Sequence, residues 1–399
     1  MDPRTLSIQD YTYDLPEARI AQQPLSERDA SKLLLFRKGL ITDHHFRSLP
    51  DLIPSNSLLV LNNTKVVNAR LIFHRASGAR IEVLCLSPME GKPVELAFAE
   101  RGSSAWECFI GNAKRWKAGE ELIATANGIE VRAMRIGTES IRLVWSPVEL
   151  SFVEVLDRIG HVPLPPYMKR PDETADRTRY NTVFAQYDGS VAAPTASLHF
   201  TTDILDRMVQ RGIRSTDLTL HVGAGTFLPV KSATMGQHSM HSEQVRIPLS
   251  MLQQLSEQLN NGPVIPVGTT ALRTLESIYW HGVKLLRQNG SNGIDIDQWE
   301  PYSYVENDLP TAQNALNAVI QNLTEKDDQQ LSGETKLLIA PGYTFRFATG
   351  LVTNFHQPQS TLLLLVAAFL GKDWRNVYDH ALASDYRFLS YGDGSLLLP

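Results

Sequence analysis

The stretch 69–153 differs in texture from the rest of the chain, and this contrast limits the folds that the chain can adopt. Short apolar or alternating runs, separated by Gly, Ser and Asn turns, cover 79–86, 94–99, 105–110, 121–124, 129–136 and 140–145. Six short strands at roughly even spacing are typical of a small antiparallel β-barrel. Because the flanking segments look α/β, we expect the barrel to be an inserted domain.

The flanking segments, 1–68 and 154–399, alternate strand and helix patterns. The spacing predicts helices over 203–210, 251–259, 271–280, 311–323 and 360–370, and strands over 57–61, 216–222, 264–267, 337–340 and 351–353. Repeated strand–turn–helix units predict one three-layer α/β main domain with a largely parallel sheet. We interpret the mostly polar stretch 288–334 as a surface excursion that carries the 311–323 helix.

Composition argues against several classes of protein. Cys85 and Cys108 are the only cysteines, which disfavours a disulfide framework or a cysteine-based zinc site. The first ten residues lack the apolar core of a signal peptide, and the longest apolar run, 362–370, is about half of what a membrane span requires. We expect a cytoplasmic protein that is monomeric and does not bind a membrane.

Candidate site residues concentrate in three clusters between 190 and 276, where small residues, hydroxyls and histidines gather at the ends of predicted strands. The clusters contain Thr195 and His199; then His221, Gly223, Gly225, Thr226, His241 and Glu243; and finally Gly268, Thr269, Arg273 and Glu276. Asn354 and His356 follow a later strand in the same way. Ligands of open α/β sheets bind at the carboxyl ends of strands, so this composition predicts an active-site wall.

The turn at Gly268 and Thr269 joins a strand to a helix. Glycine lets a ligand approach the backbone, and the free N–H groups of the helix suit an anion. Thr269, Arg273 and Glu276 fall at i, i+4 and i+7, on one face of that helix. The alternative interpretation is a helix cap with a surface ion pair.

The glycines and histidines of the second cluster do not match two common motifs. Gly223-x-Gly225 lacks the third glycine of a dinucleotide fingerprint, so a nicotinamide cofactor is not supported. His238, His241 and Glu243 do not form His-Glu-x-x-His, so we expect no metal. Proton transfer suits these histidines better, because imidazole titrates near neutrality.

Two basic clusters lie near aromatic residues. Lys169, Arg170, Arg177 and Arg179 lie close to Tyr167 and Tyr180 in the sequence, and Lys114, Arg115 and Lys117 lie close to Trp106 and Trp116. Cations beside aromatic rings suit phosphate contact with base stacking, although each cluster alone is also typical of a solvated face.

Taken in order, these motifs resemble those of one known family. They cover 163–167, 191–195, 198–201, 220–227, 240–243, 268–270, 273–277, 341–343, 353–356 and 391–393. The chain resembles the S-adenosylmethionine:tRNA ribosyltransferase-isomerases of queuosine biosynthesis from Tyr13 to its C-terminus. The resemblance implies a large α/β domain with an inserted β-barrel, as expected above.

The resemblance also implies a reaction. The family transfers the ribosyl part of S-adenosylmethionine to 7-aminomethyl-7-deazaguanine at the wobble position of a tRNA anticodon arm. It isomerises the sugar to an epoxycyclopentane, which yields epoxyqueuosine, adenine and methionine. S-adenosylmethionine is a co-substrate, and no cofactor or metal is implied.

The reaction that the resemblance implies also suggests roles for the candidate residues. The sulfonium acidifies the neighbouring ribose C5′, so protons must be moved repeatedly. We expect proton transfer by His199, His221, His241 and Glu243. Gly223, Gly225 and Thr226 are expected to hold the nucleoside, and Gly268, Thr269 and Arg273 the methionine carboxylate or a tRNA phosphate. Thr195, Glu276, Asn354 and His356 complete the expected substrate site, and Lys169, Arg170, Arg177 and Arg179 the tRNA site.

Some positions depart from the family's usual residues. Asn63 stands where an acid is usual, Asn68 where a proline is common, Ser197 where a glycine is common and Gln359 where a lysine is common. These departures leave one alternative open, a paralogue that binds RNA or a nucleoside without the complete reaction.

Overall fold

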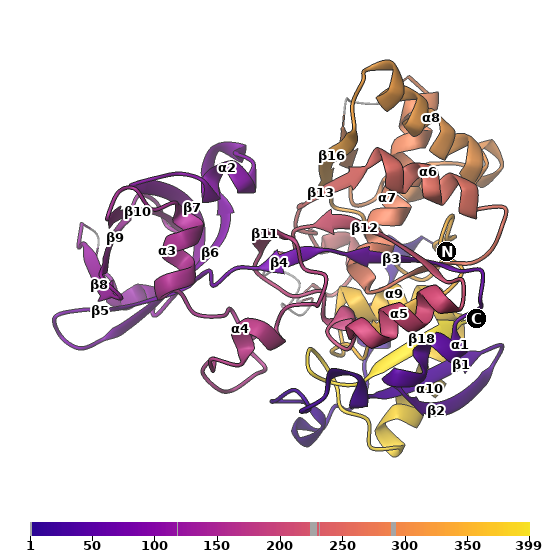
Figure 1. Cartoon of the computed structure of the whole chain (residues 1–399), viewed down its shortest axis with the longest axis horizontal. Coiled ribbons are helices and arrows are strands. Elements are labelled where there is room, and N and C mark those ends of the chain that lie inside the picture. The colour runs from indigo at the N-terminus through magenta and orange to yellow at the C-terminus, as the bar shows by residue number, and fades with distance from the viewer. Residues whose placement is uncertain (1, 118, 224–229, 231, 289–292) are drawn as a thin grey trace.

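The computed structural model describes residues 2–117, 119–223, 230, 232–288 and 293–399. A large α/β body carries a small β-barrel that stands to one side of it (Figure 1). The predicted fold class, a three-layer α/β domain with an inserted antiparallel barrel, is confirmed.

The body contains a six-stranded sheet and a four-stranded sheet. The first has the order β14 (Val264–Pro266), β3 (Leu58–Asn62), β12 (Arg214–Leu220), β13 (Glu243–Pro248), β16 (Gln330–Thr335) and β15 (Ile294–Ile296). The second has the order β17 (Leu351–Asn354), β18 (Gly394–Leu398), β1 (Lys32–Arg37) and β2 (Leu40–His45). A parallel bridge between Val267 and Val352 joins the two sheets.

The pairing within these sheets is mixed. The pairs β14–β3, β3–β12 and β15–β16 are parallel, whereas β12–β13 and β13–β16 are antiparallel. The expectation of a largely parallel sheet was therefore wrong for the part of the six-stranded sheet that contains β13, which is antiparallel to both of its neighbours. The predicted strand at 337–340 was also wrong. Strand β16 ends at Thr335, and the buried residues 337–340 that follow it belong to no strand.

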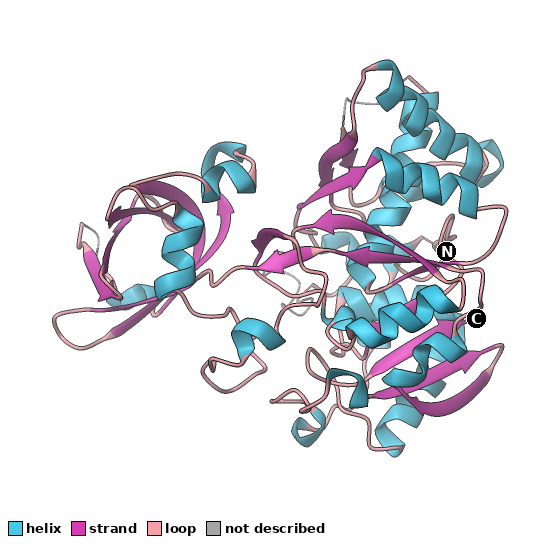
Figure 2. Cartoon of the chain, in the orientation of Figure 1, coloured by secondary structure: helices cyan, strands magenta, loops and turns pink. Residues whose placement is uncertain are grey.

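Helices cover both faces of the sheets (Figure 2). One face packs against α1 (Leu49–Leu52) and α5 (Thr202–Gln210) through Leu49, Ile204 and Met208. The other packs against α6 (Leu249–Gln258), α7 (Thr269–Leu286), α8 (Ala312–Glu325), α9 (Thr361–Leu370) and α10 (Trp374–Ala383). Helices α5, α6 and α8 each bury one stripe of apolar side chains, as their periodicity predicts, whereas α7 is buried on all sides from Thr269 to Val283.

The barrel is one six-stranded antiparallel sheet whose edge strands approach each other (Figure 1). Its strand order is β5 (Arg70–His74), β6 (Arg80–Pro88), β7 (Ser103–Gly111), β10 (Ser140–Ser146), β9 (Ile129–Arg135) and β8 (Leu122–Ala126). The predicted strand at 94–99 is instead the helix α2 (Val94–Phe98). Val94, Ala97 and Phe98 are buried while Leu96 is exposed, which is the helical spacing i, i+3, i+4.

The barrel is connected to the body by two segments. On the way out, β4 (Thr64–Val66) pairs in parallel with β11 (Tyr187–Ser190). On the way back, α3 (Phe152–Ile159) packs Phe152, Val155 and Leu156 into the barrel core, and α4 (Asp176–Arg179) follows. The domain limits 69 and 153 stay a prediction, and α3 crosses the second of them.

Candidate active site

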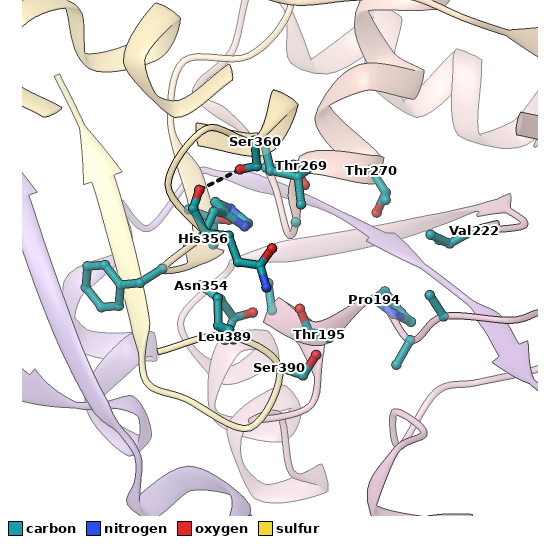
Figure 3. Close-up of a pocket in the computed structure, with 18 of the residues that line it drawn as sticks. Pro194, Thr195, Val222, Thr269, Thr270, Asn354, His356, Ser360, Leu389 and Ser390 are labelled. Atoms are coloured by element: carbon teal, nitrogen blue, oxygen red, sulfur yellow. Dashed lines mark hydrogen bonds between the residues drawn. The ribbon is translucent and has the colours of Figure 1, made fainter. Parts of the chain in front are cut away.

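A cavity lies where the end of β17 meets the beginnings of α7 and α9 (Figure 3). The segment 192–196 and Val222, which follows β12, form its opposite wall. Five predicted substrate-binding residues line it together: Thr195, Gly268, Thr269, Asn354 and His356. They are brought together because their segments end at one edge of the joined sheets.

The walls of this cavity are apolar and small, apart from a few hydroxyl, amide and imidazole groups. Ala192, Ala193, Pro194, Ala196, Val222, Leu362 and Leu389 supply most of the apolar surface. Neither a carboxylate nor a Lys or Arg side chain is among the described residues that line it. Such walls suit an uncharged aromatic base with a few directed hydrogen bonds.

The N-terminus of α7 presents hydrogen-bond donors to the cavity. Gly268 has φ 95° and donates its N–H to the Val352 carbonyl at 2.7 Å. Gly268 is the N-cap residue of α7 and has no side chain to accept a hydrogen bond. The first N–H groups of the helix therefore stay available. Within the described chain the buried Thr270 hydroxyl also has no partner. This helix end therefore suits a carboxylate or a phosphate oxygen.

A second, smaller cavity shares Thr269, Thr270 and Leu362 with the first and reaches Arg273. The Arg273 guanidinium forms a buried ion pair with Glu243. Burial lowers the pKa of Arg273 to about 10, so its side chain stays charged at neutral pH. Arg273 and Glu243, which were predicted separately as site residues, thus pair with each other, and Arg273 lies one helical turn beneath the donor end of α7.

His199 and His356 lie at the β17 end of the site. Asn354 Nδ2 is 3.3 Å from His199 Nε2 and donates to the Asp393 carbonyl at 3.3 Å. His356 Nε2 is 2.9 Å from the Thr353 hydroxyl. Burial lowers the pKa of His199 to about 4 and that of His356 to about 3, so both rings are neutral at physiological pH.

His221 connects the body to the barrel. Its Nδ1 lies 3.0 Å from Thr64 Oγ1, and its Nε2 lies 3.0 Å from Glu95 Oε1 on α2. Glu95 also forms an ion pair with Arg246. Burial raises the pKa of Glu95, but the bonds to His221 and Arg246 outweigh it and hold that pKa below its usual value. Sequence reasoning missed Glu95, because its segment was predicted as a strand.

The remaining predicted residues of the second cluster are spread more widely. His241 is exposed, and Gly223 is partly buried. Gly225 and Thr226 lie outside the described residues. His199, His221, His241 and Glu243, the four residues predicted for proton transfer, are not among the described residues that line the main cavity.

Glu276 lies on α7 but points away from the cavity. Its carboxylate accepts hydrogen bonds from the Tyr343 hydroxyl at 2.9 Å and from the N–H groups of Arg346, Phe347 and Ala348 at 2.9, 3.1 and 3.4 Å. Burial raises its pKa. In this position Glu276 holds the 343–348 loop against α7.

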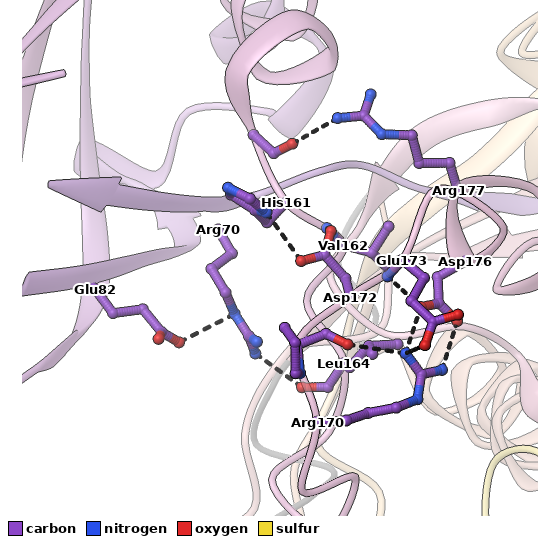
Figure 4. Close-up of polar contacts among 12 residues, drawn as sticks. Arg70, Glu82, His161, Val162, Leu164, Arg170, Asp172, Glu173, Asp176 and Arg177 are labelled. Atoms are coloured by element: carbon purple, nitrogen blue, oxygen red, sulfur yellow. Dashed lines mark hydrogen bonds and ion pairs between the residues drawn. The ribbon is translucent and has the colours of Figure 1, made fainter. Parts of the chain in front are cut away.

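The basic cluster after α3 is occupied by contacts within the chain (Figure 4). Arg170 pairs in bidentate fashion with Asp176 at 2.7 and 2.9 Å, and Arg177 donates to the carbonyls of Asp157 and Gly160. Arg179 donates to the carbonyls of Leu25 and Ser26. Lys169 is exposed and pairs with Glu17 at 2.6 Å. Most of these charged groups therefore hold the segment 160–180, the connector that follows α3, in place.

The second basic cluster also differs from its prediction. Trp106 and Trp116 are each only 2% exposed and belong to the barrel core, so they cannot stack on nucleic-acid bases. Lys114, Arg115 and Lys117 remain exposed. Where the chain is described, it contains no group of three or more His, Cys, Asp or Glu side chains placed to hold a metal, and no helix long and apolar enough to cross a membrane.

Comparison with known proteins places the chain in a family. The family described as "Queuosine biosynthesis protein" matches residues 8–397. The chain belongs to this family. It is 41% identical over 395 residues to the S-adenosylmethionine:tRNA ribosyltransferase-isomerase of Azoarcus sp. (strain BH72), which covers 98% of each protein. It is 38% identical to the protein of that name from Acinetobacter baylyi, covering 98% of this chain and 99% of that protein. The solved S-adenosylmethionine tRNA ribosyltransferase of Thermotoga maritima is 26% identical, with a TM-score of 0.47.

Three of the four departures from the family's usual residues, Asn63, Asn68 and Gln359, contact other parts of the chain. Asn63 is buried and bonds to Asp217 and Thr219, so it supports strands β3 and β12. Asn68 lies 3.4 Å from Asp157, and Gln359 bonds to Gln9 at the N-terminus. None of these three is among the described residues that line the cavity, so the alternative of a binding protein without the reaction is not favoured.

Proposed function

We propose that this chain is an S-adenosylmethionine:tRNA ribosyltransferase-isomerase that acts in queuosine biosynthesis. The observation that carries the proposal is the family match over residues 8–397. Residues from five of the motifs that suggested the family, namely Tyr167, 192–195, Val222, 268–270 and 353–356, line one cavity. The proposed reaction joins the ribosyl part of S-adenosylmethionine to 7-aminomethyl-7-deazaguanine in tRNA and releases adenine and methionine.

The cavity provides surfaces that fit the parts of the co-substrate. We assign the methionine carboxylate to the uncapped N-terminus of α7 at Gly268 and Thr269, where helix N–H groups favour an anion. Arg273 lies one helical turn beneath this position, where its ion pair with Glu243 fixes the guanidinium. Thr195 and the apolar wall suit the nucleoside, and Gly223, Gly225 and Thr226 are proposed to hold it where the chain leaves β12.

For proton transfer we propose His221 as the principal group. A carboxylate beside one imidazole nitrogen orients the ring and fixes its tautomer. Glu95 is placed in this way at Nε2, and Thr64 faces Nδ1. The neighbouring Val222 lines the cavity, so His221 lies one residue from its wall. His241 stays a proposed proton-transfer residue on the resemblance alone.

The tRNA is proposed to contact the connector that follows α3. Lys169 is the member of that basic cluster with an exposed, weakly paired charge, and it suits a phosphate. Arg170, Arg177 and Arg179 are proposed to support the shape of this surface, because their guanidinium groups bond to the chain itself. The protein is proposed to act in the cytoplasm as a monomer.

The proposal is tested by incubating the purified protein with S-adenosylmethionine and tRNA that carries 7-aminomethyl-7-deazaguanine. Free adenine is expected by chromatography, and none is expected with tRNA that carries guanine at the wobble position. His241→Asn is expected to slow adenine release, whereas the matched His238→Asn is not. If adenine does not appear while the tRNA still binds, the chain is instead a binding member of the family.

A further inference from the structure

The amide of Asn354 is held in one orientation at the wall of the cavity. Asn354 is only 2% exposed. Its Nδ2 faces two groups, His199 Nε2 and the Asp393 carbonyl, each at 3.3 Å. A carbonyl can only accept a hydrogen bond, so the NH₂ end of the amide must face Asp393.

His199 fixes the same orientation from a second side. Burial lowers the pKa of His199 to about 4, so the ring is neutral and carries a single N–H. Because the Asn354 NH₂ group can only donate, Nε2 must be the unprotonated nitrogen and Nδ1 carries the hydrogen, and Phe46 packs against the ring with centroids 4.9 Å apart. Nε2 is therefore left with a lone pair, which accepts from the Asn354 amide.

Both hydrogens of the amide are consequently used, and its oxygen is left over. Asn354 Oδ1 has no hydrogen-bond partner among the described residues, although it is removed from solvent. A buried acceptor without a partner is costly, and native structures rarely leave one unless a ligand completes it. Figure 3 shows the amide at the centre of the residues that line the cavity.

We infer that Asn354 Oδ1 accepts a hydrogen bond from an N–H group of S-adenosylmethionine, and that His199 is the positioning residue that keeps Oδ1 turned toward the co-substrate. The inference rests on the proposed function and assigns a specific contact within it. It also changes the role of His199, whose Nε2 is committed to the amide and does not carry protons during the reaction.

S-adenosylmethionine has two sources of such an N–H group. The exocyclic amine of adenine is neutral and suits a cavity without carboxylates. The ammonium of the methionine part brings its own carboxylate as counter-charge, which the N-terminus of α7 is proposed to hold. Both offer the same chemistry to Oδ1, and the experiment distinguishes them.

The test measures Kd by calorimetry for S-adenosylmethionine and for two analogues, one with hydrogen in place of the adenine amine and one without the methionine amine. The wild-type protein is expected to bind one analogue about tenfold more weakly, the effect of one lost hydrogen bond in a buried site. Asn354→Leu, which lacks the acceptor, is expected to bind that analogue as well as it binds S-adenosylmethionine. The analogue that binds more weakly to the wild type but not to Asn354→Leu identifies the group that Oδ1 contacts.

A pair of variants at His199 tests the positioning role without changing Asn354. His199→Gln keeps an acceptor for the amide and is expected to retain the tenfold discrimination. His199→Leu removes one of the two acceptors that hold the amide and is expected to discriminate less than His199→Gln. If His199 had only a structural role, discrimination between the analogues would not depend on whether residue 199 can accept a hydrogen bond.

The inference is overturned if, for both analogues, the loss of affinity relative to S-adenosylmethionine is the same on the wild-type protein and on Asn354→Leu. It is also overturned if His199→Leu discriminates between the ligands like the wild type. If the wild-type protein does not bind S-adenosylmethionine at all, the proposed function fails, and this inference fails with it. Binding of S-adenosylmethionine without coupling to Asn354 would overturn the inference and leave the proposed function standing.

Discussion

Arg170 and Lys169 are neighbours in the sequence, and the structure predicts that they have opposite roles. Arg170 forms a bidentate pair with Asp176, whose side chain is 2% exposed and also accepts from the Tyr391 hydroxyl at 2.7 Å. Burial raises the pKa of Asp176, but these hydrogen bonds and the Arg170 charge hold it below its usual value. Lys169 pairs with Glu17 where both side chains are about two-thirds exposed.

Arg170→Met removes the cation and leaves a buried carboxylate without its counter-charge. Breaking a buried pair in this way costs about 3–5 kcal/mol of unfolding free energy. Lys169→Met, the matched control, breaks an exposed pair and is expected to cost about 0–1 kcal/mol. Urea denaturation followed by circular dichroism measures both values, and Arg170→Met with Asp176→Leu is expected to recover part of the loss.

The same two variants are expected to differ in the opposite sense in tRNA binding. If Lys169 contacts a phosphate, Lys169→Met lowers the slope of log K against log salt concentration by about 0.7–0.9. Arg170→Met is expected to leave the slope of the folded protein unchanged. The reasoning is refuted if Arg170→Met keeps wild-type stability and loses about one unit of slope, because Arg170 would then be a phosphate contact.

Three further changes test other parts of the site. Glu276→Ala leaves one hydroxyl and three N–H groups without an acceptor, so we expect a loss of about 3 kcal/mol or more in urea denaturation, with the Kd for S-adenosylmethionine unchanged. Arg273→Lys keeps the charge but loses the planar fork toward Glu243, and we expect the KM for S-adenosylmethionine to rise about tenfold in steady-state assays. The pKa of Glu95 is lower in the folded protein than in the unfolded chain, so its ionised form stabilises the fold above about pH 4.5, and this stabilisation is lost as pH falls through the lowered pKa. The stability difference between wild type and Glu95→Gln is therefore expected to shrink below pH 4.5 in urea titrations, and a constant difference from pH 7 to pH 3 would contradict this.

The sequence was most informative where local signals decide the structure. Long helices such as α7 show apolar periodicity over several turns, and the turn at Gly268 needs a positive φ that glycine tolerates. The cavity residues Thr195, Thr269 and Asn354 could be predicted together because they follow or begin elements at one edge of a sheet. The five-residue helix α2 could not, since a run that short fits a strand as well as a helix.

Contacts between distant segments could not be predicted from composition. Glu95 meets His221 across 126 positions of sequence, and no local pattern indicates this pairing. The charge of Arg170 looked available for RNA because a count of cations does not show which carboxylate lies beside each one. Glu276 shares a helix face with Arg273 by spacing alone, but the 343–348 loop surrounds it in the fold.

The central claim is that this protein couples ribosyl transfer to the wobble nucleoside with the loss of adenine and methionine. The most direct measurement digests the reacted tRNA to nucleosides, follows the wobble nucleoside by mass spectrometry and counts adenine and methionine in the same reaction. The account predicts one adenine and one methionine for each modified wobble nucleoside, with no added metal. Adenine released without a change in the wobble nucleoside, or a modified nucleoside formed without adenine, would contradict it.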